Sequence, residues 1–336
     1  MAKAAITGTG HFLPDNIVTN DDLAKMFETS DEWIQQRTGI KQRRFVDFDK
    51  EPMGASDLGA RAAAKAIASA NLQKEDIDLI IYATLSPDLG FPGDGVLVQA
   101  KLDMPVGVPA LDIRNQCSGF LYGLSTANAF IRSGVYKNIL LIGSEVHSTG
   151  LDFTDRGRDV AVLFGDGAAA VVLSAVDDSD PRGIVDVTIH ADGRHSDALQ
   201  LAYPSSAEMP RLAVEKVQEG AHYPQMNGKL VFKNAVTRMP EALMTLLNRN
   251  GLQPSDIDLL IPHQANLRIA EMVQKRLELR EDQVFNNIMH YGNTTAASIP
   301  LALDEAITQG KIQSGGLLAF AAFGAGFTWG AALVRF

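Results

Sequence analysis

An internal repeat is the feature of this sequence that most restricts its fold. Residues 72–81 (LQKEDIDLII) and 252–261 (LQPSDIDLLI) are identical at seven of ten positions, with an offset of 180. Further along, a helical pattern ending at 131–134 and an apolar run at 139–142 recur at 307–310 and 317–323. The 336-residue chain is about twice the length of one ordinary domain. We therefore expect two copies of one αβ unit, residues 1–176 and 177–336.

The pattern within each copy predicts buried sheets covered by helices. Ala-rich helical stretches such as residues 56–68 alternate with Val/Ile/Leu-rich runs of strand length. Two such halves packed through shared helices predict an α/β protein in five layers, αβαβα. Residues 177–225 are polar and contain four prolines, which predicts a connection of loops with a short helix.

One uncharged stretch, residues 315–334, is long enough to span a bilayer. Gly324, Ala325 and Gly326 divide it into two short apolar runs, which favours two buried strands joined by a tight turn. The N-terminal residues lack the apolar core of a signal peptide. We expect no membrane association and a cytoplasmic location.

Composition excludes several further classes. Thirty Lys and Arg against forty Asp and Glu give a net charge of −10, which argues against a nucleic-acid-binding protein. A single cysteine, Cys117, excludes an intramolecular disulfide and a cysteine-cluster metal site. The histidines show no ligand spacing, so we expect no metal.

Cys117 lies between the apolar run 108–113 and the helical pattern 121–132. A strand-to-helix turn would place its sulfur at a helix N-terminus, where the partial positive charge favours thiolate. A lone cysteine is as often a small buried hydrophobic residue. The local context alone leaves both interpretations open.

The internal repeat points to two further polar residues that could act together with Cys117. The offset of 176 leads to Asn293, again in a turn ahead of a helical pattern, and the repeated strand ending at Ile261 is followed by His263. Singly, His263 is typical of a structural histidine and Asn293 of a helix cap. Together, a thiol, an imidazole and a carboxamide can accept an acyl group and hydrogen-bond an enolate oxygen.

Five segments carry a resemblance to a known family: 115–120 (NQCSGF), 165–167 (GDG, with Asp166), 263–269 (HQANLRI), 291–300 (YGNTTAASIP) and 323–330 (FGAGFTWG). They resemble the β-ketoacyl-acyl carrier protein synthase III family in motif order and spacing, from Ile6 to Phe336. The resemblance implies a thiolase-like fold, a homodimer and a condensing acyltransferase of fatty acid biosynthesis.

The resemblance also implies a ping-pong reaction. Cys117 would accept an acyl group from an acyl-CoA primer, and His263 and Asn293 would hold the thioester carbonyl of malonyl-acyl carrier protein during decarboxylation. The main-chain N–H groups of Cys117 and Ala325 would form the oxyanion hole, where such donors are worth about 3 to 4 kcal/mol each. CoA thioesters are substrates here, and no cofactor is implied.

The same resemblance assigns CoA-binding residues. Trp33 and Arg37 match the positions beside the adenine and the phosphates, Arg156 matches an arginine on the other face of the adenine, and Asn266 lies in a matching motif. An indole and a guanidinium plane can enclose a purine. Without the family match, Trp33 would more often be a core aromatic of a helix over residues 22–36.

An acidic carrier protein would need a basic docking surface on this acidic chain. The helical pattern 267–279 carries three cations, and Lys233 would join them in the family's geometry; the docking residues are Lys233, Arg268, Lys275 and Arg276. A solvated helix face is the alternative. Phe91 matches a residue that comes from the dimer partner and closes the acyl pocket.

Some positions differ from the family. Residues 324–326 are usually Gly-Gly-Gly, and Ala325 retains the N–H group but resists positive φ. Gly93, Asp94 and Gly95 replace small residues after Phe91. These differences leave the primer open, from acetyl to medium-chain, branched or secondary-metabolic acyl groups, and they leave the pathway open.

Other functions remain on the same fold. One is non-decarboxylative head-to-head condensation of fatty acyl-CoAs, or acyl transfer onto a small molecule. Another is a non-catalytic partner subunit of a heteromeric synthase, which the presence of Cys117, His263 and Asn293 together argues against. A degradative thiolase is disfavoured because it normally uses a second cysteine.

Overall fold

Two β-sheets form the frame of the molecule in the computed structural model, which describes residues 2–336. The first sheet has the strand order β1-β7-β6-β4-β5, and the second has the order β11-β12-β13-β8. Strands of the first sheet are β1 Lys3–Phe12, β4 Leu79–Ala83, β5 Ala110–Ile113, β6 Asn138–Glu145 and β7 Gly167–Val176. Strands of the second are β8 Gly183–Ala191, β11 Leu259–Pro262, β12 Leu317–Gly324 and β13 Thr328–Arg335.

The two sheets repeat one topology. In each, an outer strand pairs antiparallel with its neighbour (β1 with β7, β8 with β13), which pairs antiparallel with a central strand. That central strand pairs parallel with the next, β6 with β4 and β12 with β11. In the second sheet, an isolated parallel bridge between Leu260 and Val284 lies at the position that β5 has in the first sheet.

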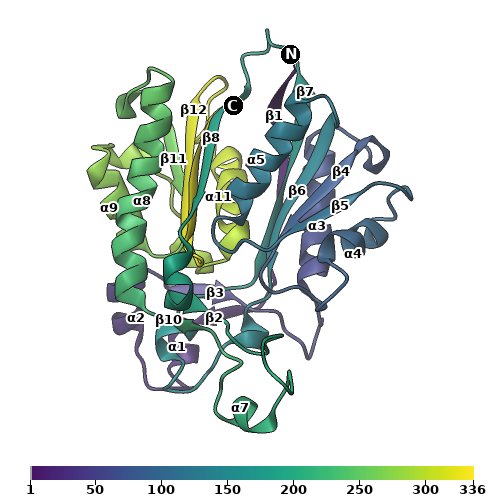
Figure 1. Ribbon diagram of the computed structural model, residues 1–336. Helices are drawn as coiled ribbons and strands as arrows, with labels where there is room; N and C mark the ends of the chain where they lie inside the picture. The colour runs from purple at the N-terminus through teal and green to yellow at the C-terminus, as the bar shows by residue number, and fades with distance from the viewer. Residues whose placement is uncertain (1) are drawn as a thin grey trace.

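Helices separate and cover the sheets in the five layers expected from the sequence (Figure 1). The central helices α5 (Gly119–Arg132) and α11 (Ser298–Thr308) share one core with both sheets. The first sheet is covered by α3 (Ala55–Ser69) and α4 (Asp94–Lys101), and the second by α8 (Gly228–Arg249) and α9 (Leu267–Arg276). This arrangement brings the ends of strands from both halves to one level of the molecule.

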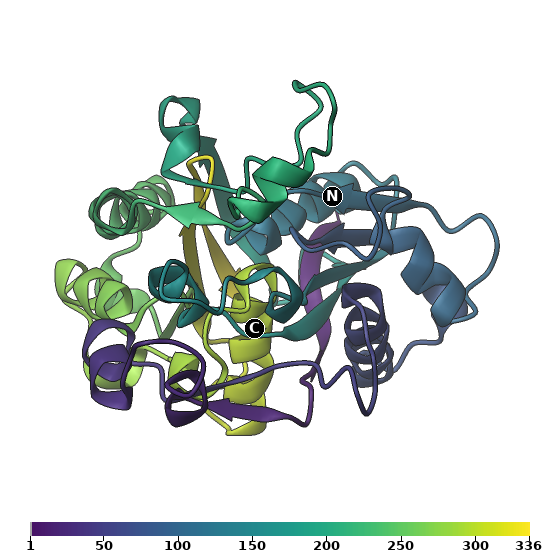
Figure 2. The same cartoon turned by 90° about the horizontal axis from the view of Figure 1, so that it is seen from below.

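A smaller apolar cluster closes the lower end of Figure 1, where segments from both halves meet. Its elements are short: β2 Ile17–Thr19, α1 Asn20–Leu23, α2 Asp31–Thr38, β3 Gln42–Arg44, α6 Arg158–Ala161 and α10 Ile288–Tyr291. Figure 2 shows these elements from below, under the ends of the central helices.

Two predicted elements are wrong. The expected connection over residues 177–225 contains β8, an edge strand of the second sheet, as well as β9 (Leu199–Gln200), α7 (Val214–Gln218) and β10 (Gln225–Met226). The strand was missed because most of its side chains are half-buried or exposed, so it lacks an apolar run. The expected helix over 22–36 is two helices, because Ser30 caps α2 by accepting a hydrogen bond from the Trp33 N–H.

The uncharged C-terminal stretch forms β12 and β13, as predicted. Its turn uses Gly326 at φ 129°, whereas Ala325 is not among the residues with positive φ. Alanine therefore fits the position where the family usually has glycine. Within residues 2–336, no helix is both long and apolar enough to cross a bilayer.

Candidate active site

Cys117 lies in the turn between β5 and α5, two residues before the helix begins. Its side chain is buried, with 6% of the residue exposed. The turn is tied to the other half of the molecule, because the Ser118 and Thr328 hydroxyls lie 2.7 Å apart and Thr328 donates to the Ala325 carbonyl at 2.9 Å. The cysteine is thus fixed against the β12–β13 turn.

The end of β12 approaches Cys117 closely. A Cβ atom added to Gly324 would lie 2.6 Å from the Cys117 Cβ and 3.1 Å from its Sγ. Glycine is required at this position by that contact. The backbone of residues 324 and 325 therefore runs directly beside the sulfur.

His263 follows β11, the parallel neighbour of β12, and is buried. Its Nδ1 lies 2.7 Å from the hydroxyl of Ser298 at the start of α11. Its Nε2 is buried without a hydrogen-bond partner among the described residues. An unpartnered ring nitrogen is costly unless a ligand uses it.

Asn293 lies in a loop that pairs with the first half, since its N–H donates to the Leu163 carbonyl and its carbonyl accepts from the Gly165 N–H. Its Oδ1 accepts a hydrogen bond from the Thr295 N–H at 2.8 Å. The side chain lies in the wall of the second cavity together with Cys117 and lowers the pKa of its thiol. Cys117 and Asn293 thus line one cavity, and His263 directly follows β11, the strand that pairs with β12.

The electrostatics of Cys117 differ from the sequence-based expectation of a favoured thiolate. Burial raises the pKa of Cys117 to about 12, the negative charge of Glu145 adds to the rise, and the Asn293 side chain opposes it. Burial lowers the pKa of His263 to about 3. Near neutral pH the unliganded site therefore holds a neutral thiol and a neutral imidazole, because desolvation outweighs the helix N-terminus.

Two cavities meet at Cys117, which belongs to the wall of both. The first, of about 720 Å³, is mainly apolar and extends past Ala325 toward β9. Its other lining side chains include Met53, Leu85, Val146, His147, Leu151 and Thr295. The second, of about 620 Å³, contains Asn293 and Gly324 near Cys117 and opens between α2, α8 and α9.

The mouth of the second cavity is basic and aromatic. Arg37, Lys229 and Arg268 line it together with Trp33 and Asn266. The Arg37 guanidinium lies 4.2 Å from the centre of the Trp33 ring. Asn266 caps α9 by accepting from the Arg268 N–H and donates to the Arg37 carbonyl, which fixes these residues to one another.

Arg156 is not among the residues that line this cavity, and its role beside the adenine stays a prediction. Its guanidinium hydrogen-bonds Asp152 at 2.6 Å and the Glu219 carbonyl at 2.9 Å. Arg158 lies over Trp33, with its guanidinium carbon 4.8 Å from the ring centre. The two arginines are separated by one residue, and spacing alone does not decide which one faces the indole.

The four predicted docking residues divide into two places. Lys233 and Arg268 are exposed near the cavity mouth, where the Arg268 guanidinium lies 5.7 Å from the Phe232 ring. Lys275 and Arg276 are exposed in the last turn of α9. Lys275 lies seven positions after Arg268 in α9, which corresponds to a rise of about 10 Å along the helix axis.

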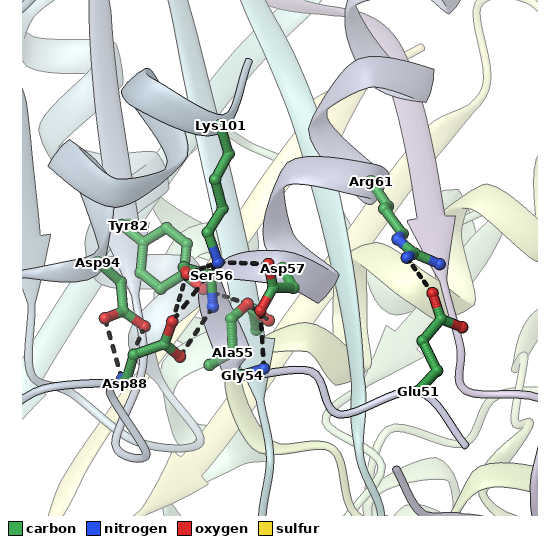
Figure 3. A network of polar contacts seen from close by, with 11 residues as sticks. Glu51, Gly54, Ala55, Ser56, Asp57, Arg61, Tyr82, Asp88, Asp94 and Lys101 are labelled. Atoms are coloured by element: carbon green, nitrogen blue, oxygen red, sulfur yellow. Dashed lines mark hydrogen bonds and ion pairs between the residues drawn. The ribbon is translucent and has the colours of Figure 1, made fainter. Parts of the chain in front are cut away.

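Phe91 is 88% exposed in the single chain, so it closes neither cavity of its own subunit. The neighbouring Asp94 is buried, and its carboxylate accepts from the Asp88 N–H, while Asp112 accepts from the N–H groups of Asp94 and Gly95. Figure 3 shows Asp88 between Asp94 and Lys101. A Cβ on Gly93 or Gly95 would lie within 3 Å of the Asp112 carboxylate, which explains these two glycines.

Sequence analysis missed three buried polar residues behind Cys117. The carboxylate of Glu145 accepts from the Thr295 hydroxyl at 2.5 Å, and this hydroxyl lies 3.4 Å from the His147 Nε2. Burial raises the pKa of Glu145 to about 7 and lowers that of His147 to about 3. The position of Glu145 at the end of an apolar strand, where polar residues gather, was the available signal.

Within residues 2–336, no group of three or more His, Cys, Asp or Glu side chains has the arrangement of a metal site.

Two family descriptions match the chain. Residues 111–193 match "3-Oxoacyl-[acyl-carrier-protein (ACP)] synthase III", and residues 247–336 match the C-terminal part of the same enzyme. The β-ketoacyl-[acyl-carrier-protein] synthase III of Caldanaerobacter subterraneus subsp. tengcongensis is 45% identical over 332 residues, covering 99% of this chain and 97% of that protein.

Solved structures give the same result. The crystal structure of 3-oxoacyl-[acyl-carrier-protein] synthase III from Aquifex aeolicus is 43% identical with a TM-score of 0.89, covering 99% of this chain and 100% of that one. The priming β-ketosynthase of the R1128 polyketide pathway is 30% identical with a TM-score of 0.87, covering 99% and 96%.

Proposed function

The chain belongs to the β-ketoacyl-acyl carrier protein synthase III family and is an acyl-transferring condensing enzyme, and we propose that its two substrates reach Cys117 in turn. The observation that carries the proposal is the meeting of two unlike cavities at one buried cysteine. An acyl group held on Cys117 would occupy the apolar first cavity. The second cavity would admit first acyl-CoA and then the carrier-bound extender.

In the first step, the acyl group of acyl-CoA passes from the CoA sulfur to the Cys117 sulfur, and the thiol proton passes to CoA. The neutral thiol favours a proton transfer coupled to attack, since a free thiolate is scarce at a pKa of about 12. Trp33, Arg37 and Asn266 bind the nucleotide end of CoA at the basic mouth. Arg158 supports the indole from its place over the ring.

In the second step, malonyl-acyl carrier protein enters and loses CO₂. His263 and Asn293 donate hydrogen bonds to its thioester carbonyl, which becomes an enolate oxygen as the carbon–carbon bond breaks. Donation from the Ser298 hydroxyl to Nδ1, which lies 2.7 Å away, would place the proton of the neutral imidazole on the free Nε2. The neutral form is retained at working pH because burial lowers the pKa of His263 to about 3.

The enolate carbon then attacks the acyl-Cys117 carbonyl. The main-chain N–H groups of Cys117 and Ala325 hold the resulting oxyanion. Its collapse releases a 3-oxoacyl-carrier protein and the Cys117 thiolate, which takes a proton from solvent to restore the thiol. Ala325 serves this role through its N–H group, which alanine retains at a φ that is not positive. Lys233 and Arg268 at the mouth, with Lys275 and Arg276 further along α9, attract the acidic carrier protein.

The protein acts as a cytoplasmic homodimer without a cofactor. β5 is an edge strand, with Leu111 39% exposed, and Phe91 and Leu89 stand exposed beside it. An unpaired edge with apolar side chains favours pairing with a second copy. In such a dimer Phe91 would reach the partner's first cavity. Sedimentation of the purified protein as a monomer would contradict this part of the proposal.

The complete reaction is tested with purified protein, acyl-CoAs of graded length and malonyl-acyl carrier protein. We expect stoichiometric CO₂ and a 3-oxoacyl-carrier protein, measured by mass spectrometry of the carrier. Condensation of two acyl-CoAs without CO₂ release would instead indicate the non-decarboxylative reaction.

A further inference from the structure

Glu145 is a buried carboxylate to which the reaction above gives no role. It is fully buried at the end of β6, and it accepts hydrogen bonds from the Ser86 hydroxyl at 2.7 Å and the Thr295 hydroxyl at 2.5 Å. The Thr84 hydroxyl and the N–H groups of Leu85 and Ser86 complete its donor set. A carboxylate buried among so many fixed donors is held rigidly and holds them in return.

Thr295 is the donor whose backbone is strained. Its φ is 43°, a left-handed conformation that is a genuine outlier for a β-branched residue. Such strain persists only where surrounding contacts enforce it. The short bond from its hydroxyl to Glu145 is one of those contacts.

The strained conformation has a direct consequence for Asn293. The Thr295 N–H donates to the Asn293 Oδ1 at 2.8 Å, which fixes the amide orientation. With Oδ1 occupied, the Nδ2 hydrogens are left for the cavity that Asn293 lines together with Cys117. The chain of contacts therefore runs from Glu145 through Thr295 to Asn293, in the cavity wall that it shares with Cys117.

We propose that Glu145 and Thr295 are positioning residues that hold the Asn293 amide with its Nδ2 hydrogens toward the thioester carbonyl. The inference rests on the role proposed above for Asn293. Glu145 lines neither cavity. Thr295 belongs to the wall of the first cavity, and it acts on the thioester carbonyl in the second cavity through Asn293. They matter most for decarboxylation, where the amide must meet a developing oxyanion, and least for acyl transfer to Cys117.

The test compares Thr295→Val, which keeps the shape and removes the hydroxyl, with Thr295→Ser, which retains it. Acylation of Cys117 is measured by intact-protein mass spectrometry, and decarboxylation by CO₂ release from malonyl-acyl carrier protein. For Thr295→Val we expect CO₂ release to fall about 10²-fold, the size of effect seen when an oxyanion donor is lost. The loss of acylation should be at least about tenfold smaller, because valine keeps the shape of the first-cavity wall. Thr295→Ser should recover most of the decarboxylation.

Ser148→Ala is the matched control. Ser148 also donates its hydroxyl to a buried carboxylate, Asp166, at 2.6 Å, but it has no contact with Thr295 or Asn293. We expect both half-reactions of this variant to remain at the wild-type level. Thr295→Ala replaces Thr295→Val if the valine variant does not fold.

A double variant separates positioning from an independent effect. If Thr295 acts through Asn293, the Thr295→Val/Asn293→Ala protein should be no slower than Asn293→Ala alone. Multiplied losses in the double variant, or parallel losses of both half-reactions in Thr295→Val, would overturn the inference. Absence of CO₂ release in the wild type would instead refute the proposed function.

Discussion

The two cavities that meet at Cys117 are similar in volume and differ in chemistry. The first is lined mainly by apolar side chains and continues into the first half and the β9 segment, whereas the second opens through Arg37, Lys229 and Arg268 to solvent. The apolar lining of the first cavity is suited to an acyl chain, and the basic opening of the second cavity is suited to an anionic CoA or carrier protein. The difference shows how one thiol can retain one substrate while a second enters.

Substitution of the two side chains proposed to act in decarboxylation should give the largest losses of activity. His263→Ala and Asn293→Ala remove side-chain donors from the second-cavity side and leave Cys117 in place. We expect decarboxylation of malonyl-acyl carrier protein to fall about 10²- to 10³-fold. Acylation of Cys117, measured by intact mass, should continue in both variants. A loss of acylation as large as the loss of CO₂ release would contradict the separate roles of the two cavities in the two half-reactions.

The basic mouth provides the next test. Arg268→Glu reverses one charge at the second cavity, and we expect about a tenfold rise in KM for malonyl-acyl carrier protein with little change in acyl transfer. Steady-state kinetics at two salt concentrations measure it, because the effect should shrink as salt screens the charge. Lys275→Glu, further along α9, is the control with a smaller effect. Equal losses in both half-reactions would contradict the docking role.

The apolar cavity is tested by reducing its volume. Thr149 is exposed at the wall of the first cavity, so Thr149→Trp adds bulk there with little risk to folding. We expect the preference for longer over shorter acyl-CoAs to fall about tenfold, since each methylene in a pocket is worth about 1 to 3 kcal/mol. Competition between acyl-CoAs, read by intact mass, gives the ratio. An unchanged preference would place the acyl chain elsewhere.

The smallest effect concerns stability at the Phe91 loop. Burial raises the pKa of Asp94 from its ordinary value of 3.8 to about 7, and Asp88 adds to the rise. The folded state therefore binds this proton more tightly than the unfolded state, so its contribution to stability is present at low pH and is lost as pH rises toward 7. Asp94→Asn should have a higher melting temperature than the wild type above about pH 7, with a smaller difference near pH 5.

Circular dichroism melts at several pH values measure this shift. Asp197→Asn is a matched control, because it makes the same change at an exposed carboxylate. A melting temperature of Asp94→Asn that tracks the wild type at every pH would contradict a shifted pKa at Asp94.

Much of this arrangement was predictable because the chain repeats itself. The segments 72–81 and 252–261 placed β4 and β11 at equivalent positions, and the offsets from them led to His263 and Asn293. The two halves have the same topology and pack through the central helices, so the loops that follow equivalent strands face each other. The central polar residues were therefore accessible from pattern alone.

The remainder depended on three-dimensional contacts that no spacing encodes. β8 was missed because most side chains of this edge strand are half-buried or exposed, so it lacks an apolar run. The Arg158 guanidinium over Trp33 and the hydrogen bond of Arg156 to Asp152 are contacts of this kind. The neutral state of Cys117 follows from burial, whereas sequence reasoning weighed only the helix N-terminus.

The most direct test of the account is the intact mass of the protein after incubation with acyl-CoA alone. We expect one acyl group per chain in the wild type and none in Cys117→Ser, with the adduct mass following the length of the acyl-CoA supplied. The adduct should disappear, with release of CO₂, when malonyl-acyl carrier protein is added. An adduct that persists in Cys117→Ser, or the absence of any adduct in the wild type, would contradict the claim that both cavities serve this thiol.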